Sequence, residues 1–401
     1  GDVGWYTSLA LDASSQPHIS FYSQGDDRLV YAHVGDAGWQ TETVDAGGHV
    51  GKYADLALDK EGTPYVSYYD VDGEALKVAR RGDDGWSVER VDGPGIGLHT
   101  SVALGADDRV HVSYEGSEYG ELRYAVATDQ GWYTETVDSE GWPGYRPSID
   151  LDAGGEPHIG YLDTREDELR YVVHGAEGWR VEDVDPAIDA VWDSSLALDV
   201  EDRARISYFS STDWSLNHAK RRSDGWRTLV LARDLGLGSR SCNTSLALDG
   251  YALPHIGYNT CVWWGSAYCL PHELKYAYQD EGGWHFETVD SEGNVGEGVS
   301  LAIDEGNFAH LAYGSYVHGS PAYGSSEYSY EPNDVRYAFQ DATGWHIETV
   351  ESEGNVGSHI SLALDDAGSP HLVYYDKTDG DLIYAYRKTY RSFIPLAVEQ
   401  R

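Results

Sequence analysis

Apolar and polar residues alternate along short stretches of the chain. Residues 8–12 alternate leucine with serine, alanine and aspartate, 17–22 alternate Ile19 and Phe21 with more polar neighbours, and 29–33 and 39–44 follow as two further short stretches rich in apolar or β-branched residues. A period of two residues, rich in β-branched and aromatic side chains, is typical of strands rather than helices. Gly, Asp, Asn and Ser between the stretches are tight-turn residues. The first 44 residues therefore predict four short strands.

The first of these stretches recurs along the whole chain. Its clearest copy is Ser-Leu-Ala-Leu-Asp at 361–365, and the others lie at 8–12, 55–59, 101–105, 148–152, 195–199, 245–249 and 300–304. The first residues of these eight copies are 47, 46, 47, 47, 50, 55 and 61 positions apart. A recurrence of this length indicates a repeat architecture.

Four antiparallel strands per repeat, repeated around a ring, predict an all-β, eight-bladed β-propeller. We expect a single domain over 1–401, with the pentapeptide as the innermost strand of each blade. The blades are predicted at about 1–47, 48–93, 94–140, 141–187, 188–236, 237–291, 292–352 and 353–401.

A Gly-Trp pair opens the predicted outermost strand of seven repeats, at Trp39, Trp86, Trp132, Trp179, Trp226, Trp284 and Trp345. The eighth repeat ends differently, and we predict that its tail, 390–398, supplies the missing outer strand. Pro395 is tolerated there because an outermost strand has an unpaired edge. Each blade is then one contiguous repeat, and the ring closes by packing of blade eight against blade one.

The consensus is Leu-Ala-Leu-Asp-x-x-Gly-x-Pro-His-Ile-Ser-Tyr-Tyr-Asp, then Leu-x-Tyr-Ala, then Gly-Trp-x-x-Glu-Thr-Val. It resembles the repeats of secreted bacterial β-propeller proteins. The turn at 36–39 is distantly similar to the Asp-box of sialidase-like propellers, but Gly directly precedes Trp and the leading Ser is missing. The resemblance implies the fold and carries no sialidase chemistry, because such propellers include lectins, lyases and scaffolds.

Charge excludes several partners. The chain has 28 Lys and Arg against 68 Asp and Glu, a net charge of −40, which repels nucleic acid and anionic lipid. No apolar run reaches the length of about 18 residues that a membrane span needs, so we expect no membrane insertion. The chain begins at Gly1 and has no Met. We read this as a processed protein whose secretion signal has been removed, and expect an extracellular or cell-surface location.

Three cysteines, Cys242, Cys261 and Cys269, fall in the sixth repeat. A disulfide fits an extracellular protein. We favour Cys261–Cys269, at the neck of an insertion, while pairing of Cys242 with Cys261 stays open because spacing does not separate the two. The sequon at Asn243 opens a predicted strand, which disfavours its glycosylation.

A second-strand histidine recurs in six repeats, as His18, His111, His158, His255, His310 and His371. A catalytic residue is needed once, so repetition indicates a structural role in which a ring nitrogen bonds a neighbouring blade or turn. The aspartate that ends each first strand is likewise expected to cap a turn.

Acidic residues gather in the turns after the second strands. The turn at 376–381 holds Asp376, Asp379 and Asp381, and Asp70 and Asp163 fall at the same rim. Ca²⁺ takes six to eight oxygen ligands, and this turn offers half of such a set. Ca²⁺ is therefore the one cofactor suggested, and a solvated acidic turn is the alternative.

Repeats six and seven are longer than the others, and both carry their insertion between the second and third strands. Aromatic residues with Ser and Gly are the composition of recognition loops, and long ordered loops are usually functional. We predict a ligand-binding patch on one face, made of Trp263, Trp264, Tyr268, Tyr316, Tyr323, Tyr328 and Tyr330. The alternative is that these loops only cover the rim.

We interpret the chain as a secreted, non-enzymatic binding or structural propeller. Its expected partner is a glycan, a surface polymer or an extracellular protein, with assembly into larger units as a further option. The alternative is a polysaccharide-active enzyme, a lyase or glycoside hydrolase, with His318, Tyr323 and Glu327 as candidates. The insertions contain no Lys or Arg to neutralise a uronate, which disfavours a lyase there.

Overall fold

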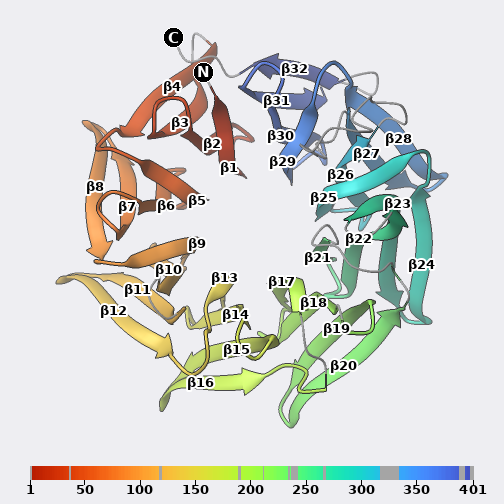
Figure 1. Cartoon of the computed structure of the whole chain (residues 1–401), viewed down its shortest axis with the longest axis horizontal. Helices are drawn as coiled ribbons and strands as arrows, with labels where there is room; N and C mark the ends of the chain where they lie inside the picture. The colour runs from red at the N-terminus through yellow and green to blue at the C-terminus, as the bar shows by residue number, and fades with distance from the viewer. Residues whose placement is uncertain are drawn as a thin grey trace.

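The protein is described by a computed structural model. It describes residues 2–35, 38–116, 120–187, 191–210, 212–233, 235, 243–264, 268–316, 334–387 and 393–397, of which 191–192, 261–264, 268–272, 316 and 394–397 are described by their backbone alone. This part of the chain forms eight four-stranded antiparallel sheets arranged in a ring (Figure 1). The predicted eight-bladed propeller is confirmed, and we number the sheets as blades one to eight. Within these ranges there is no helix long and apolar enough to cross a bilayer.

The strands of blades one to four are β1 Val3–Leu11, β2 Pro17–Ser23, β3 Arg28–Gly35, β4 Gly38–Asp45, β5 Val50–Leu58, β6 Pro64–Asp70, β7 Ala75–Gly82, β8 Gly85–Asp92, β9 Ile96–Leu104, β10 Val110–Gly116, β11 Leu122–Thr128, β12 Gly131–Asp138, β13 Tyr145–Leu151, β14 Pro157–Asp163, β15 Glu168–Gly175 and β16 Gly178–Asp183.

The strands of blades five to eight are β17 Val191–Leu198, β18 Ala204–Ser210, β19 Ser215–Arg222, β20 Gly225–Ala232, β21 Thr244–Leu248, β22 Pro254–Trp264, β23 Tyr268–Asp280, β24 Gly283–Asp290, β25 Asn294–Ile303, β26 Ala309–Tyr316, β27 Asp334–Asp341, β28 Gly344–Glu351, β29 Val356–Leu364, β30 Pro370–Asp376, β31 Asp381–Arg387 and β32 Phe393–Ala397.

Within each blade the strands pair in chain order, the first nearest the axis and the fourth at the outside (Figure 1). The tail supplies β32, in which Phe393 lies opposite Arg387 and Ala397 opposite Ile383, so every sheet is contiguous in sequence. Blades eight and one close the ring without exchanging a strand. Val3 N donates to Gly380 O at 2.9 Å, and the cluster around Ile19 includes Leu382 and Tyr384 of blade eight.

The repeated histidines are structural, as predicted. His18 Nδ1 lies 2.5 Å from the hydroxyl of Tyr31, on the third strand of the same blade, and His18 Nε2 lies 3.6 Å from Asp12. Asp12 also accepts the backbone amides of Ser14 and Gln16 at 2.8 Å, which is the expected turn cap. The same His–Tyr pair occurs in five other blades, as His111–Tyr124, His158–Tyr171, His255–Tyr276, His310–Tyr337 and His371–Tyr384. These histidines bind within their own blade.

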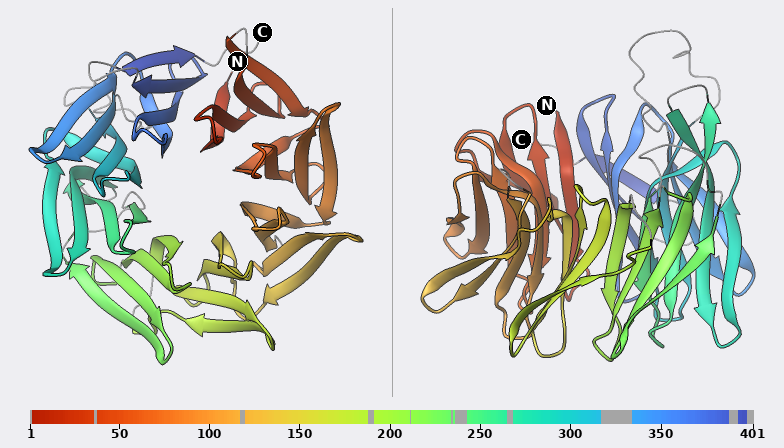
Figure 2. Two further views of the ribbon diagram at one scale, coloured as in Figure 1. Left: turned by 180° about the vertical axis from the view of Figure 1, so that it is seen from behind. Right: turned by 60° about the horizontal axis from the view of Figure 1, so that its bottom comes forward.

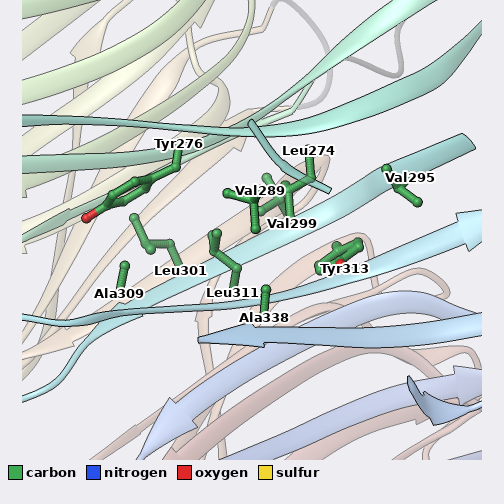
Figure 3. Packing of buried hydrophobic residues seen from close by; sticks show 10 residues of the cluster. All are labelled: Leu274, Tyr276, Val289, Val295, Val299, Leu301, Ala309, Leu311, Tyr313 and Ala338. Atoms are coloured by element: carbon green, nitrogen blue, oxygen red, sulfur yellow. The ribbon is translucent and has the colours of Figure 1, made fainter. Parts of the chain in front are cut away.

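The tyrosine of this pair also contacts the next blade. Tyr31 meets Trp86 edge-on at 5.0 Å, and the Trp86 indole donates to Glu42 of blade one at 2.8 Å. Buried residues therefore cluster between blades rather than within them. Figure 3 shows one such cluster, in which Leu274 of blade six packs with Val299 and Leu311 of blade seven. Each blade is thus stabilised by both neighbours.

Candidate functional site

One position in the innermost strand changes chemistry from blade to blade, although the surrounding unit repeats. It lies two residues before the Ser or Asp that opens each pentapeptide. In chain order it is occupied by Tyr6, Tyr53, His99, Arg146, Asp193, Asn243, Gly298 and His359. Side chains that only hold the repeat together would be expected to repeat with it, as the histidines do.

The backbone at this position is left-handed in several blades. The φ angles are 52° at Tyr6, 56° at Tyr53, 46° at His99, 50° at Arg146 and 55° at His359. The ladder also slips here: Trp5 pairs with Tyr22, but the next paired residue is Ser8, opposite Ser20. A left-handed φ costs a non-glycine residue roughly 1–2 kcal/mol. Bulges of this kind re-aim side chains, and such strain concentrates at functional sites.

These side chains gather around the axis of the ring. We call Tyr6, Tyr53, His99, Arg146 and His359 the axial mouth. They come from blades one, two, three, four and eight, which are consecutive around the ring. They line a cavity of about 440 Å³, together with Thr7, Ser8, Ala54, Asp55, Thr100, Pro147, Ile360 and Ser361.

Aromatic rings form a continuous wall in the axial mouth. The centroids of Tyr6 and Tyr53 are 4.7 Å apart, those of Tyr53 and His99 4.3 Å, and those of His99 and Tyr145 4.9 Å. On the other side, Tyr6 lies 6.3 Å from His359. The wall crosses four blade boundaries, so only closure of the ring assembles it.

Two polar side chains of the mouth have carboxylate neighbours. His99 Nδ1 lies 2.6 Å from Glu115 Oε2, which orients the imidazole. The Arg146 guanidinium stands 5.6 Å from the Tyr145 ring centre and 3.8 Å from Asp193 Oδ1, and its side chain is 54% exposed. Arg146 therefore presents a cation to solvent beside an aromatic wall.

Burial sets the protonation of several groups here. Burial, with the Tyr53 hydroxyl nearby, raises the pKa of Tyr6 to about 12, so Tyr6 is a neutral hydrogen-bond donor at neutral pH. Burial raises the pKa of Asp193 to about 6, because the Thr244 amide and Arg146 offset it only in part. Burial also raises the pKa of Asp55, which accepts hydrogen bonds from the Ser8 hydroxyl and the Val102 amide. Asp55 thus links three blades.

Three residues of the predicted aromatic patch, Trp263, Trp264 and Tyr268, lie on the strands of a lengthened hairpin in blade six. Trp264 pairs with Tyr268 at the end of β22 and β23, and Trp263 pairs with Cys269. Tyr316 ends β26 of the neighbouring blade. Three further patch residues and the remaining catalytic candidates lie outside the described residues: Tyr323, Tyr328, Tyr330, His318 and Glu327.

The cysteines of this hairpin are set diagonally. Cys261 lies opposite Pro271, whereas Cys269 lies opposite Trp263. Diagonal neighbours in a sheet have Cα atoms about 7–8 Å apart, beyond the usual disulfide range of about 4.4–6.8 Å. A Cys261–Cys269 disulfide would need this register to adjust, and it stays a prediction. Cys242, the alternative partner, lies outside the described residues.

The acidic rim is part of the fold. Asp376 accepts the Thr378 amide at 2.8 Å and so caps its own turn. Asp70 and Asp163 are buried. Their carboxylates lie 2.8 Å from Lys77 and 3.0 Å from Arg170, respectively. Over the described ranges, no group of three or more His, Cys, Asp or Glu residues, including Asp376, Asp379 and Asp381, is arranged to hold a metal ion. Calcium binding stays a prediction without a ligand set.

The axial mouth was not predicted from the sequence. Its residues include tyrosine, histidine and arginine, none of which signals a left-handed backbone by itself. The sequence nevertheless held a signal. When the eight repeats are aligned, the residue two positions before each pentapeptide varies in size and charge, although the surrounding positions are regular. The sequon residue Asn243 falls in the same column, and its side chain accepts the Gly298 amide of the next blade at 3.4 Å.

No family model matches the chain, and no curated protein matches it. Among solved structures, the Dos1 propeller superposes with a TM-score of 0.54 at 10% identity, over 93% of this chain and 92% of that one. An ulvan lyase, a polysaccharide lyase bound to -[GlcA(1-4)Rha3S]-, gives 0.52 at 12% identity, over 98% and 92%. The SapL1 lectin, solved with α-methyl fucoside, gives 0.46 at 12%, over 87% and 96%. At these identities the likeness establishes the fold alone.

Proposed function

We propose that the chain is a non-enzymatic glycan-binding propeller and that its axial mouth receives part of a saccharide chain. One observation carries this proposal: five consecutive blades hold the same strained inner-strand position and fill it with large polar side chains of three kinds, tyrosine twice, histidine twice and arginine once. The left-handed backbone at this position costs stability in every one of these blades. A ligand that differs from end to end would use it.

The chemistry of the mouth suits a sugar. Tyrosine faces stack on the apolar face of a pyranose, and the Tyr6 hydroxyl, whose pKa burial raises to about 12, stays protonated as a donor. Arg146 can bind hydroxyls or a carboxylate of the same chain. The cavity of about 440 Å³ lies within the range of about 300–1,000 Å³ common for ligand pockets.

We include the blade-six and blade-seven insertions as a second contact region. Tyr6 lies near the start of β1, which pairs with the end of β2, so the mouth lies toward the face with the second-to-third-strand turns. The β22–β23 hairpin is the corresponding connection in blade six and extends beyond the ring (Figure 2). A glycan leaving the mouth could then cross toward Trp263 and Trp264. The proposal takes the protein to act outside the cell, where such polymers lie.

The second candidate is a polysaccharide lyase, which Arg146 favours. Elimination next to a uronate needs a base, and a cation that neutralises the carboxylate. The insertions lack that cation, whereas Arg146 shares the mouth with Tyr53 and His99. In this reading Arg146 binds the carboxylate, His99 takes the proton from the carbon next to it, and the Tyr53 hydroxyl gives a proton to the glycosidic oxygen that leaves. The neighbouring ulvan lyase demonstrates that the fold can carry such an activity.

A glycan array followed by titration calorimetry tests the first candidate. An aromatic anchor is worth about 2 kcal/mol or more, so the loss of one should weaken binding about thirtyfold, and Tyr6→Ala with Tyr53→Ala should weaken it by more than that. Tyr133, which is 53% exposed on the outer strand β12, offers a matched control, and Tyr133→Ala should bind normally. Binding that survives the double change but is lost in Trp263→Ala with Trp264→Ala would move the site to the hairpin.

Digestion of uronate polysaccharides distinguishes the two candidates. A binding module releases no product, whereas a lyase releases unsaturated ends that absorb in the ultraviolet. If such ends appear and Arg146→Ala abolishes them, the second candidate replaces the first.

A further inference from the structure

A largely buried carboxylate joins neighbouring blades at several interfaces. Asp45 of blade one accepts the Tyr68 hydroxyl at 2.7 Å and Lys77 Nζ at 2.9 Å, both from blade two. The same arrangement of aspartate, tyrosine and cation occurs at three further interfaces, as Asp92–Tyr114–Arg123, Asp138–Tyr161–Arg170 and Asp290–Tyr313–Arg336. Hydrogen bonds to an ionised group are roughly twice as strong as neutral ones, so these links stabilise the ring.

The interface between blades five and six has the donors without the carboxylate. Asp45 pairs with Leu29 in its ladder, and the residue in the same place in blade five, opposite Leu216, is Ala232. Tyr258 and Lys275 of blade six nevertheless pair with each other, as Tyr68 and Lys77 do in blade two. This interface is therefore built to receive a carboxylate that its own strand does not supply.

The missing group leaves a cavity of about 260 Å³. Tyr258 is only 3% exposed, and its hydroxyl bonds no residue in the part of the chain that the structure describes. Burial raises the pKa of Tyr258 to about 12, so the hydroxyl keeps its proton. Lys275 Nζ instead contacts Glu273 at 2.8 Å and the Thr288 hydroxyl at 2.9 Å.

The other walls are mostly apolar. Leu231, Ala232 and Leu235 come from blade five and the segment after it, and Phe286, which is 48% exposed, lies at the outer side in blade six. Glu287 also lines the cavity, but it already accepts the Trp345 indole at 2.6 Å. Tyr258 lines this cavity, so an occupant with an acceptor oxygen can accept a hydrogen bond from its hydroxyl.

We propose that this cavity binds a small monocarboxylate with an apolar body, such as a short aliphatic or aromatic acid. The ligand carboxylate takes the place of the missing aspartate and accepts from the Tyr258 hydroxyl and Lys275 Nζ. Its hydrocarbon part packs on Leu231, Leu235 and Phe286. A bare inorganic anion would leave these apolar walls uncovered. The site is separate from the axial mouth and does not depend on its function.

Benzoate titration of the full chain tests the proposal, with benzamide as the neutral control. Benzoate should bind and raise the melting temperature, whereas benzamide should do neither. Ala232→Asp supplies the carboxylate from the chain, and should weaken benzoate binding at least tenfold while raising the melting temperature without ligand. Lys275→Met should weaken binding and leave the benzamide result unchanged.

Asp45→Ala makes the matched vacancy between blades one and two. Benzoate should then bind at a second site and recover part of the lost stability. If Asp45→Ala does not fold, the effect of Ala232→Asp on benzoate binding still tests the proposal. The proposal fails if wild-type protein binds no benzoate, or if Ala232→Asp binds it unchanged. Tyr6→Ala with Tyr53→Ala, which tests the glycan proposal, should leave benzoate binding intact.

Discussion

At the scale of single residues, four of the tryptophans that open outer strands join two blades in two ways. The ring of Trp86 packs edge-on against Tyr31 of the preceding blade, and its indole donates to Glu42 there. Trp179, Trp226 and Trp345 make the same two contacts. Trp39 at the ring closure has the same ring contact, with Tyr384 at 4.8 Å, but its indole bonds no described residue. Comparing Trp86 with Trp39 therefore separates the contribution of ring packing to stability from the contribution of the indole hydrogen bond.

Trp86→Phe should lower the free energy of unfolding by about 1 kcal/mol more than Trp39→Phe does. Both changes keep an aromatic ring, but only the first removes a hydrogen bond and leaves Glu42 with one donor fewer. Urea unfolding followed by circular dichroism measures the difference. Equal losses would mean that the indole–glutamate bond contributes nothing to stability.

His218 is a residue whose chemistry depends on its neighbours. It occupies in blade five the place that Tyr31 has in blade one, and it meets Trp284 edge-on at 5.1 Å. Burial, with the charges of Arg205 and Lys220, lowers the pKa of His218 to about 3. The unfolded histidine has a pKa of about 6.5. Below that pH the unfolded chain therefore binds a proton at His218, whereas the folded chain does not, and this favours unfolding.

Wild-type protein should therefore lose stability relative to His218→Phe as the pH falls below about 6.5, by about 1.4 kcal/mol per pH unit. Above that pH the difference between the two should stay constant. Urea unfolding of both proteins at several pH values gives the slope. Comparison with the variant cancels the carboxylates, such as Asp193, whose raised pKa acts in the opposite direction. Parallel pH profiles would contradict the buried, neutral state of His218.

At the scale of elements, β32 completes the last blade with a different sequence from the other outer strands. Phe393 meets Tyr337 edge-on at 5.1 Å, in the place that tryptophan takes elsewhere. Glu348, the acceptor that corresponds to Glu42, binds Arg387 at 2.5 Å, as Glu42 binds Arg81 at 2.8 Å, but receives no indole among the residues that the structure describes. Blade eight therefore keeps the aromatic contact with the preceding blade but not the hydrogen bond from an indole N–H.

Ending the chain at Arg387 should lower the free energy of unfolding by more than about 2 kcal/mol, because the Phe393 contact is lost and the edge of β31 is left unpaired. Thermal melting measures this. Phe393→Trp serves as the control and should keep or raise stability, since Glu348 lies within the reach that Trp86 has for Glu42. An unchanged melting curve after truncation would make β32 an appendage.

At the scale of the whole molecule, charge and closure decide stability. A net charge of −40 on one ring repels itself, and among the strands that the structure describes none is exchanged between blade eight and blade one. Salt screens such repulsion, with a Debye length of about 10 Å at about 0.1 M.

Sodium chloride should therefore raise the melting temperature, and Ca²⁺ should raise it no more than Mg²⁺ at equal concentration. Differential scanning calorimetry compares the three salts. A stabilisation specific to Ca²⁺, and abolished by Asp379→Asn with Asp381→Asn, would establish the carboxylate turn of blade eight as a calcium site. Loss of stability with sodium chloride would show that ion pairs, not net repulsion, dominate the surface.

The sequence by itself determined the blades. Strand patterning and turn residues act over fewer than about ten neighbours, so each copy of the unit specifies the same four strands wherever it occurs. The pentapeptides thereby predict eight blades, and the tail after Arg387 predicts the last outer strand. The repeated histidines could be assigned to structure because they recur.

Tertiary structure decided which side chains meet. Tyr6 and Tyr53 are 47 residues apart, and only the ring brings them to one axis. The inner strand also begins earlier than the pentapeptide, at Val3, and the added residues hold the bulge that turns Tyr6 inward. Likewise, Ala232 matters only because Tyr258 and Lys275 face it from another blade. Contacts between repeats follow from packing and closure, which no local pattern of residues encodes.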